Sequence, residues 1–441
     1  MSIRQNFPTT PPSLVLDFAN SKTLDPRITF SRTNPTATRM NELGLIETVG
    51  ADIPRFDHEY DASTGAVRSL GLLVEESRSN QIRNNTMQGA VVGTPGTAPT
   101  NWTPINRSNL TWSIAGTGID SGVYYVDLKL SGTANATQSP TFTFESGSQI
   151  SASNGQTWST SCFIKLVSGS TTGITQIILA QDERSTTYLT GGNSSNFLSS
   201  INSSTTNIFS SCRYSFSRTN TNASTTFLHP YLVVTPTNGA VIDITLRIGM
   251  PQTELGSFST SVIPTTGLPA TRNHDRAYYE NVDQTEWFNK TEGTVVFEHT
   301  DVPYSSSNPD TGWPAVGFAN TGGGSNPAIQ YFITKDYGDA QYLVRRFYPG
   351  GDSANITPPG GTGSAAPASK VGFVYKADDY ALVRNGSLVG TDTSGAVPDA
   401  YTLIFGMNGV TATDNNWNAH LKNLQYYPTR LSNTVLQNLT K

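Results

Sequence analysis

Short runs of alternating apolar and polar residues recur along most of the chain, and clusters of turn-forming residues separate them. In Val123–Leu130 the alternation extends over eight positions, as expected for a strand with one buried face. Between Leu110 and Gly249 such runs recur about every ten to fifteen residues, a spacing typical of β-sandwiches. This pattern predicts an all-β fold.

Composition narrows the class of protein further. The 441 residues exceed what one ordinary hydrophobic core holds, so we expect more than one domain. Only 14% of the residues are charged, the net charge is −5, and Lys and Arg are scattered singly, which argues against nucleic-acid binding. The sequence contains no apolar run of the roughly 18 residues that a membrane span needs. The first twelve residues also lack the apolar segment of a signal peptide.

Five short motifs follow one another within residues 1–85, which we expect to form a small N-terminal β-rich module. They are Leu16-Asp17-Phe18, Phe30-Ser31-Arg32, Gly44-Leu45-Ile46, Pro54-Arg55-Phe56-Asp57 and Gly71-Leu72-Leu73-Val74-Glu75-Glu76. In this order they resemble the N-terminal module of phage virion proteins of the tail-fibre type, although Asn34-Pro35 departs from that pattern at one turn. The resemblance implies attachment to other virion proteins through this module. It also implies a location in the virion, after synthesis in the host cytoplasm without a signal peptide.

The same module carries arginines and carboxylates that can pair with one another. Arg32, Arg55 and Arg78 can each hold a carboxylate through two hydrogen bonds, which would stabilise a module with a small core. Glu75 and Glu76 are adjacent, so on a strand they point to opposite faces and cannot flank one glycosidic bond. We therefore interpret these charged residues as structural.

Residues 86–266 are predicted to form a jelly-roll-like sandwich. Three segments resemble carbohydrate-binding modules, namely TWSTSCFIKL, SSCRYSFSRT and IGMPQTELGSFSTSVIPT. We expect Ile248–Thr266 to be the last strand and exit of this domain, because Pro264 cannot donate to a β-ladder. Trp158 is assigned to the core. Cys162 and Cys212 either remain free thiols or face each other across that core.

Residues 267–290 are predicted to form a connector, in which Arg272, His274, Asp275 and Arg276 are expected to dock domains against each other. Residues 291–441 resemble concanavalin A-like (laminin-G-type) sandwiches, on the segments GTVVFEH, ALVRNGSLVGTDT and HLKNLQYYPTRLS. Asn385-Gly386 predicts a hairpin tip, since both residues tolerate a positive φ. Ser432 is expected to cap a short C-terminal helix.

Candidate binding residues follow from the chemistry of sugar recognition, in which aromatic rings stack on apolar sugar faces. The glycan-binding candidates are Trp102, Trp112, Tyr188, Trp313, Tyr337 and Trp417. No cofactor is predicted. Calcium is a weaker alternative, because some relatives of the C-terminal sandwich bind it, and its candidate ligands are Asp336, Asp339 and Asp414.

Catalytic motifs are missing from the sequence. There is no G-x-S-x-G elbow, P-loop or zinc spacing, so we expect no enzyme and no catalytic residue. The main hypothesis is a phage virion structural protein, a fibre-type component that contacts host surface glycans. The alternatives are a capsid decoration or tail-assembly protein that binds only virion proteins, and an enzyme that degrades surface polysaccharide. A homotrimer is compatible with the fibre hypothesis, although no heptad repeat points to one.

Overall fold

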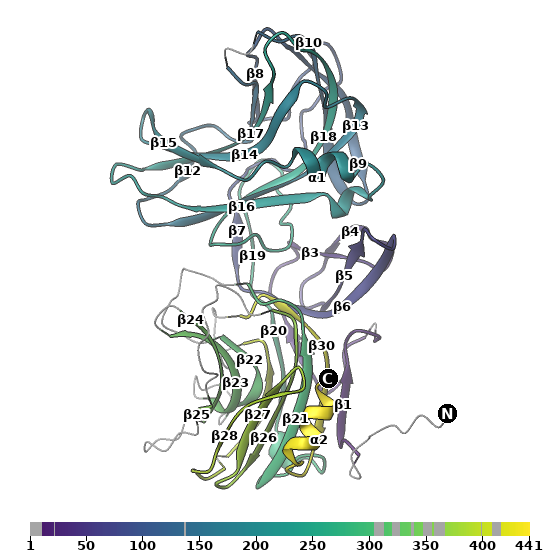
Figure 1. Cartoon of the computed structure of the whole chain (residues 1–441), viewed down its shortest axis with the longest axis vertical. Helices are drawn as coiled ribbons and strands as arrows, with labels where there is room; N and C mark the ends of the chain where they lie inside the picture. Colours follow the sequence, from purple (N-terminus) through teal and green to yellow (C-terminus); the bar gives the residue numbers. More distant parts are fainter. Residues whose placement is uncertain are drawn as a thin grey trace.

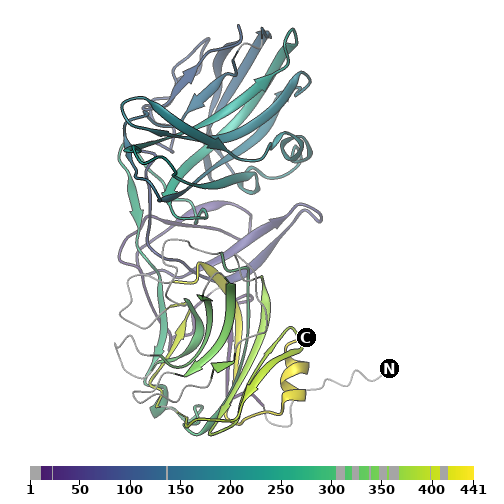
Figure 2. The same ribbon diagram turned by 60° about the vertical axis from the view of Figure 1, so that its left-hand side comes forward.

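The chain folds into two β-sandwiches that lie end to end along the long axis of the molecule (Figures 1 and 2). The computed structural model describes residues 11–21, 23–135, 138–303, 313–319, 327–336, 339–346, 355–356, 367–397, 399–407 and 416–441. The strands within these ranges pair antiparallel, which confirms the predicted all-β fold class with two sandwiches. The described helical elements are short, namely α1 (Leu198–Ser203), α2 (Asn433–Leu439) and the 3-10 turns η1 (Phe209–Ser211) and η2 (Val282–Gln284).

The first sandwich consists of a five-stranded and a six-stranded sheet. The five-stranded sheet has the order β16 (Arg213–Thr219), β13 (Thr157–Gly169), β18 (Val241–Leu255), β10 (Val123–Thr133) and β9 (Thr111–Asp120). The six-stranded sheet has the order β15 (Tyr188–Asn193), β14 (Ile174–Arg184), β17 (Phe227–Pro236), β11 (Thr141–Thr143) and β8 (Thr103–Ile105), with β12 (Ile150–Ser151) also paired to β17.

Alternation along the strands builds the core of this sandwich. In β10, Val126, Leu128 and Leu130 are buried and the residues between them are half-buried. Trp158 is buried in the same apolar cluster, as predicted. The two cysteines are buried free thiols rather than a disulfide.

The second sandwich is formed by an eight-stranded and a seven-stranded sheet. The eight-stranded sheet has the order β28 (Ser387–Asp392), β27 (Tyr380–Arg384), β26 (Ser369–Lys376), β21 (Glu292–His299), β30 (Ala419–Tyr427), β6 (Ala66–Val74) and β5 (Arg55–Asp61), with β1 (Leu14–Asp17) also paired to β30. The seven-stranded sheet has the order β2 (Thr29–Ser31), β20 (Arg276–Glu280), β29 (Thr402–Phe405), β22 (Trp313–Ala319), β23 (Pro327–Asp336), β24 (Asp339–Arg346) and β25 (Asn355–Ile356).

Two local predictions for this sandwich are confirmed. Asn385 and Gly386 connect β27 to β28 with φ values of 46° and 75°, the left-handed conformation that a tight hairpin turn requires. The Ser432 hydroxyl accepts a hydrogen bond from the Val435 amide at 3.3 Å and so caps α2.

Most strands of residues 1–85, predicted as a module, complete the second sandwich. β1, β5 and β6 belong to its eight-stranded sheet and β2 to its seven-stranded sheet. β7 (Arg78–Asn80) pairs with β19 (Ala270–Arg272), while β3 (Ala37–Met40) and β4 (Ile46–Val49) pair with each other. The reason is that short strands such as β1 have too little apolar area for a core of their own. Leu14 and Leu16 are instead buried in the core of the second sandwich.

The segment Ile248–Thr266 ends the first sandwich and returns to the N-terminal residues. After β18, the backbone N–H of Thr265 donates to the side-chain oxygen Oδ1 of Asn85 at 2.7 Å. The backbone N–H of Asn85 donates in return to the hydroxyl of Thr265 at 2.9 Å. The carboxylate of Glu254 accepts hydrogen bonds from the amide and the hydroxyl of Thr260, each at 2.7 Å. Glu254 therefore holds the turn that follows the strand.

Five charged residues, which we call the buried charge cluster, lie where this segment meets the second sandwich. They are Arg32, Arg55, Glu75, Arg272 and Asp275, and each is at most 4% exposed. Arg32 Nη1 lies 3.0 Å from Asp275, Arg55 Nη1 lies 2.6 Å from Glu75, and Arg55 also pairs with Asp275. The prediction that Arg32 and Arg55 pair with carboxylates is confirmed, but neither holds one carboxylate through two parallel hydrogen bonds, and Arg55 instead divides its two Nη atoms between Glu75 and Asp275.

Glu75 remains ionised in this buried position. Burial by itself would raise its pKa, but the charges of Arg272 and Arg55 and the hydrogen bonds from Ser261 outweigh burial and lower the pKa below its ordinary value. The amide and the hydroxyl of Ser261 donate to this carboxylate at 2.8 and 2.6 Å. The cluster thus ties the exit of the first sandwich to the N-terminal strands and the connector.

Candidate functional site

The most strongly alternating strand of the six-stranded sheet is β17. Leu228, Leu232 and Val234 are buried in the core of the first sandwich, whereas His229 and Tyr231 are half-buried on the other side of the sheet. Side chains alternate between the two faces of a strand. β17 therefore presents a histidine and a tyrosine on the outer face of the sheet.

Neighbouring strands place further polar side chains beside these two rings. In the register of the sheet, Asp182 of β14 lies opposite His229, and Thr143 of β11 lies opposite Tyr231. The Tyr231 hydroxyl donates to Asp182 Oδ1 at 2.8 Å. The rings of His229 and Tyr231 lie 5.5 Å apart between centroids.

These residues line a concavity of about 420 Å³, which we call the outer-face pocket. Arg107, Gln138 and Ser139 contribute from the chain around β8 and β11, and Arg184 contributes from the end of β14. Ligand pockets for small molecules commonly measure about 300–1,000 Å³. The outer-face pocket has the size of a site for one or two sugar rings.

Burial sets the ionisation of the groups in the pocket. Burial raises the pKa of Asp182, and burial together with the nearby Asp182 raises the pKa of Tyr231. Burial and the charge of Arg184 lower the pKa of His229 to about 4. His229 is therefore neutral at pH 7, and the two arginines are the cations of the pocket.

Trp102 and Trp417 are buried, which corrects the expectation that they are exposed for stacking on a sugar. Trp102 is 5% exposed, packs edge-on against Phe142 and Phe144, and donates its indole N–H to the Asn84 carbonyl at 2.8 Å. Trp417 is 0% exposed. Both indoles serve as core residues, because a large apolar ring next to a sandwich edge gains more by packing than by exposure.

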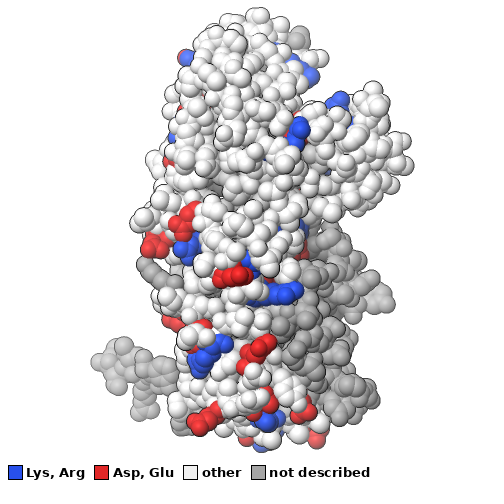
Figure 3. Space-filling view, turned by 180° about the vertical axis from the view of Figure 1, so that it is seen from behind, with Lys and Arg blue, Asp and Glu red and all other residues white. Residues whose placement is uncertain are grey.

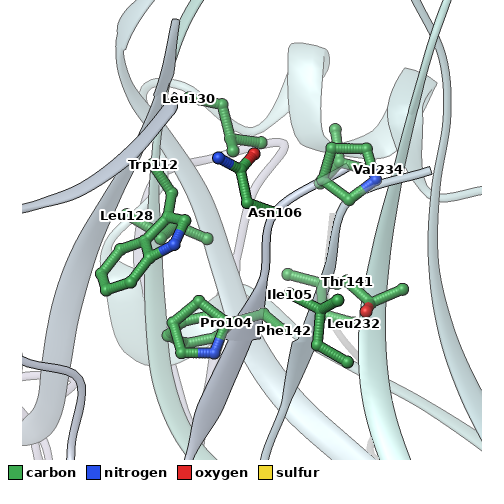
Figure 4. A pocket seen from close by; sticks show the side chains of 11 residues that line it. Pro104, Ile105, Asn106, Trp112, Leu128, Leu130, Thr141, Phe142, Leu232 and Val234 are labelled. Carbon is green, nitrogen blue, oxygen red and sulfur yellow. The ribbon is translucent and has the colours of Figure 1, made fainter. Parts of the chain in front are cut away.

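Trp112 lies at the rim of the first sandwich and is half-buried. With Leu128, Phe142 and Leu232 it lines a small apolar pocket between the two sheets (Figure 4). The volume of that pocket is about 10 Å³, which is room for about one water molecule. No sugar ring fits there.

Tyr188 is the predicted aromatic that lies in an accessible position near the outer-face pocket. It is 59% exposed, begins β15 and is paired with Arg184 of β14. Arg184 in turn lines the outer-face pocket. Tyr188 therefore lies on the strand next to the pocket, opposite one of its lining residues.

The remaining candidates lie in or near the second sandwich. Trp313 begins β22, Asp336 ends β23 and Asp339 begins β24, while Tyr337 and Asp414 lie outside the described residues. Within the described part of the chain, no group of three or more His, Cys, Asp or Glu side chains is arranged to hold a metal ion. Nor does any helix in those ranges have the length and apolar character needed to cross a membrane.

The residues that build the outer-face pocket were not singled out from the sequence. The stretch from His229 to Val234 lies among the runs between Leu110 and Gly249, and the alternation of His229 and Tyr231 with apolar residues is the signal that could have marked its outer face. Asp182, Arg107 and Arg184 come from separate parts of the chain. Only the pairing of the strands brings them to one place.

Neither a protein-family model nor a curated protein sequence matches this chain. Among solved structures, the chain is similar to the Ruminococcus gnavus IT-sialidase CBM40 bound to alpha2,3 sialyllactose, with 16% identity over 35% of this chain and 84% of that chain and a TM-score of 0.28. It is also similar to domain 4 of AbnA, a GH43 extracellular arabinanase from Geobacillus stearothermophilus, in complex with arabinotriose, with 10% identity over 42% of this chain and 81% of that chain and a TM-score of 0.28.

A further similarity covers more of the chain. Trypanosoma rangeli sialidase in complex with sialic acid is 10% identical over 79% of this chain and 55% of that chain, with a TM-score of 0.29. With identities and TM-scores this low, what these proteins bind or cleave says nothing about this chain.

Proposed function

We propose that this protein is a non-enzymatic structural protein of a phage particle and that it binds a glycan in the outer-face pocket. The observation that carries the glycan-binding part is the pocket itself, a concavity of about 420 Å³ on the outer face of the six-stranded sheet. A site built on paired strands is held in place before the ligand arrives, which lowers the entropic cost of binding.

The lining of the pocket suits a saccharide. Gln138, Ser139 and Thr141 supply amide and hydroxyl groups for the hydroxyls of a sugar. The ring of Tyr231 and the side chain of Val233 supply apolar surface for the C–H face of a sugar ring. Small-molecule sites commonly combine an apolar surface that contacts the ligand with a few polar groups that fix the orientation of the ligand.

The single carboxylate in the described lining of the pocket favours binding over hydrolysis. Most glycosidases need two carboxyl groups on either side of the scissile bond, and among the described residues that line the pocket Asp182 is the one acid. Some glycosidases use a tyrosine nucleophile instead, but burial and Asp182 raise the pKa of Tyr231, which disfavours the phenolate. These features support a binding protein without catalysis.

The virion part of the proposal rests on the five motifs in residues 1–85 that resemble phage virion proteins. The arrangement of the sandwiches is compatible with it. β1 pairs with β30 in the second sandwich, and the first sandwich lies at the other end of the molecule (Figure 1). A chain attached near β1 would therefore present the outer-face pocket away from the point of attachment.

A glycan array that includes host lipopolysaccharide, probed with the full chain, tests the proposed function. We expect the chain to bind saccharides and to lose binding when Tyr231 is replaced by alanine, while the Tyr401→Ala control on the second sandwich keeps it. Absence of binding to every saccharide would overturn the glycan-binding part. Release of reducing sugar by the purified chain would overturn the non-enzymatic part.

Copy number in the particle tests the virion part. A few dozen copies or fewer per phage particle are expected for a fibre-type component, and hundreds would favour a shell decoration that binds only virion proteins. Absence of the chain from purified particles would overturn a structural role in the virion.

A further inference from the structure

Two arginines that line the outer-face pocket make no ion pair and no guanidinium hydrogen bond among the described residues, although both lie close enough to Asp182 for their charges to lower its pKa. They are Arg107 and Arg184. By contrast, Arg218 pairs with Glu183 at 2.7 Å and Arg247 with Asp127 at 2.9 Å. A guanidinium beside a pocket whose N–H groups donate to no carboxylate is available to a ligand.

The two arginines approach the pocket from opposite sides. Arg184 ends β14, whereas Arg107 follows β8 at the edge of the sheet, and β17 and β11 lie between these strands. Asp182 and Tyr231 occupy the middle of the same face and are hydrogen-bonded to each other. A ligand that fills the pocket therefore lies between two cations.

The charge of the pocket is the reverse of the charge of the chain. The chain carries a net charge of −5, yet the described lining holds two arginines against the single carboxylate of Asp182. His229 contributes no charge at neutral pH, since its pKa is lowered to about 4 by burial and by Arg184. On the face shown in Figure 3, charged side chains are sparse over much of the first sandwich.

We propose that the outer-face pocket binds a saccharide bearing a carboxylate group, and that Arg184 and Arg107 hold this acidic sugar. The inference rests on the proposed function, because it names the class of glycan for the same pocket. The planar guanidinium matches a carboxylate through two parallel hydrogen bonds. The single negative charge of a carboxylate is also tolerated near Asp182 better than the double charge of a phosphate monoester.

Matched pairs of saccharides test this inference with the full chain. Isothermal titration calorimetry at low salt measures the affinity of the chain for oligogalacturonate and hyaluronan oligosaccharides and for their carboxyl-reduced counterparts. The reduced forms keep the sugar rings and lose the charge. We expect at least one acidic form to bind about ten-fold or more tightly than its reduced form, the effect of one charge-assisted hydrogen bond. That preference should weaken as salt is added.

Charge-removing variants assign the preference to the pocket. Arg184→Gln should reduce the preference for the acidic form about ten-fold, and the exposed Arg107→Gln provides a second variant if the first is poorly folded. Lys129→Gln is the matched control, because Lys129 lies on β10 of the other sheet and pairs with Asp243 at the surface. It should leave the preference unchanged.

The outcomes separate the two proposals. Equal binding of acidic and carboxyl-reduced forms would overturn the acidic-sugar inference and leave glycan binding standing. Binding of a sulfated galactose oligosaccharide with no binding of either carboxylate probe would also overturn it. Absence of binding to these probes and to every saccharide of the glycan array would overturn the proposed function itself.

Discussion

The Nη1 atom of Arg55 lies 2.6 Å from Oε2 of Glu75, and both side chains are buried. Arg272 approaches the same carboxylate oxygen at 3.3 Å, although it lies in the connector that follows the first sandwich. Removing one member of a buried ion pair leaves an uncompensated charge, which costs more than the pair contributes. The junction between the sandwiches therefore depends on this pair.

We expect Glu75→Gln to lower the free energy of unfolding by about 3–5 kcal/mol, because the buried Arg272 would lose its carboxylate and the buried Arg55 would keep only Asp275. Urea denaturation measures the change. The control is Arg68→Gln, since Arg68 is 60% exposed and pairs at 3.3 Å with the exposed Glu59. That variant should lose no more than about 1 kcal/mol, and equal losses in the two variants would contradict the prediction.

Acid should destabilise the protein in two stages. Burial lowers the pKa of His299 from 6.5 to about 4, so between these values the unfolded chain binds a proton that the folded chain does not. Stability then falls as the pH falls, by up to about 3 kcal/mol for this histidine. Below about pH 4.5 the stabilising charge of Glu75, whose folded pKa is lowered, is lost as well.

Urea denaturation at pH 7 and pH 5 checks the histidine stage. His299→Gln should reduce the difference in unfolding free energy between the two pH values, whatever its effect at pH 7 alone. An unchanged difference in the variant would show that another group is responsible.

The hydroxyl of Tyr231 should contribute to ligand binding through its hydrogen bond to Asp182 at 2.8 Å. Tyr231→Phe keeps the ring and leaves Asp182 without this donor, so we expect saccharide affinity to fall about five- to ten-fold. Calorimetric titration with the best saccharide from the array measures it. Tyr125→Phe, on β10 of the other sheet, should bind as the unsubstituted chain does, and a comparable loss there would point to a general change of fold.

The exposed Tyr188 should extend the binding surface beyond the pocket. Tyr188→Ala removes an aromatic ring that is 59% exposed, so affinity for longer oligosaccharides should fall by about 1 kcal/mol while affinity for a monosaccharide changes little. A series of chain lengths in the titration distinguishes the two effects. The same loss for every length would place Tyr188 inside the pocket instead.

Trp417 should matter for stability alone. It is 0% exposed, so Trp417→Ala should lower the free energy of unfolding by about 3–5 kcal/mol. Saccharide affinity of the folded fraction should stay the same. A selective loss of affinity with unchanged stability would restore Trp417 as a binding residue.

Local patterns in the sequence determined the elements of this protein. The alternation in Val123–Leu130 predicts the strand β10, Asn385-Gly386 predicts the turn between β27 and β28, and Ser432 predicts the start of α2. Each of these depends on neighbouring residues only, through side-chain alternation, backbone φ or a capping hydrogen bond. The presence of Arg32, Arg55 and Arg78 together with acidic residues in the same part of the sequence likewise predicts that these arginines pair with carboxylates.

Tertiary structure decided which partners those groups obtain and where a ligand can bind. Glu75 and Asp275 are 200 residues apart, yet the Glu75 amide donates to the Asp275 carboxylate at 2.9 Å. Asp182, Arg107 and Tyr231 form one pocket only because β14, β17, β11 and β8 pair side by side. Strand alternation fixes two possible faces for each side chain, but the pairing of distant strands chooses which face is buried and which residues share it.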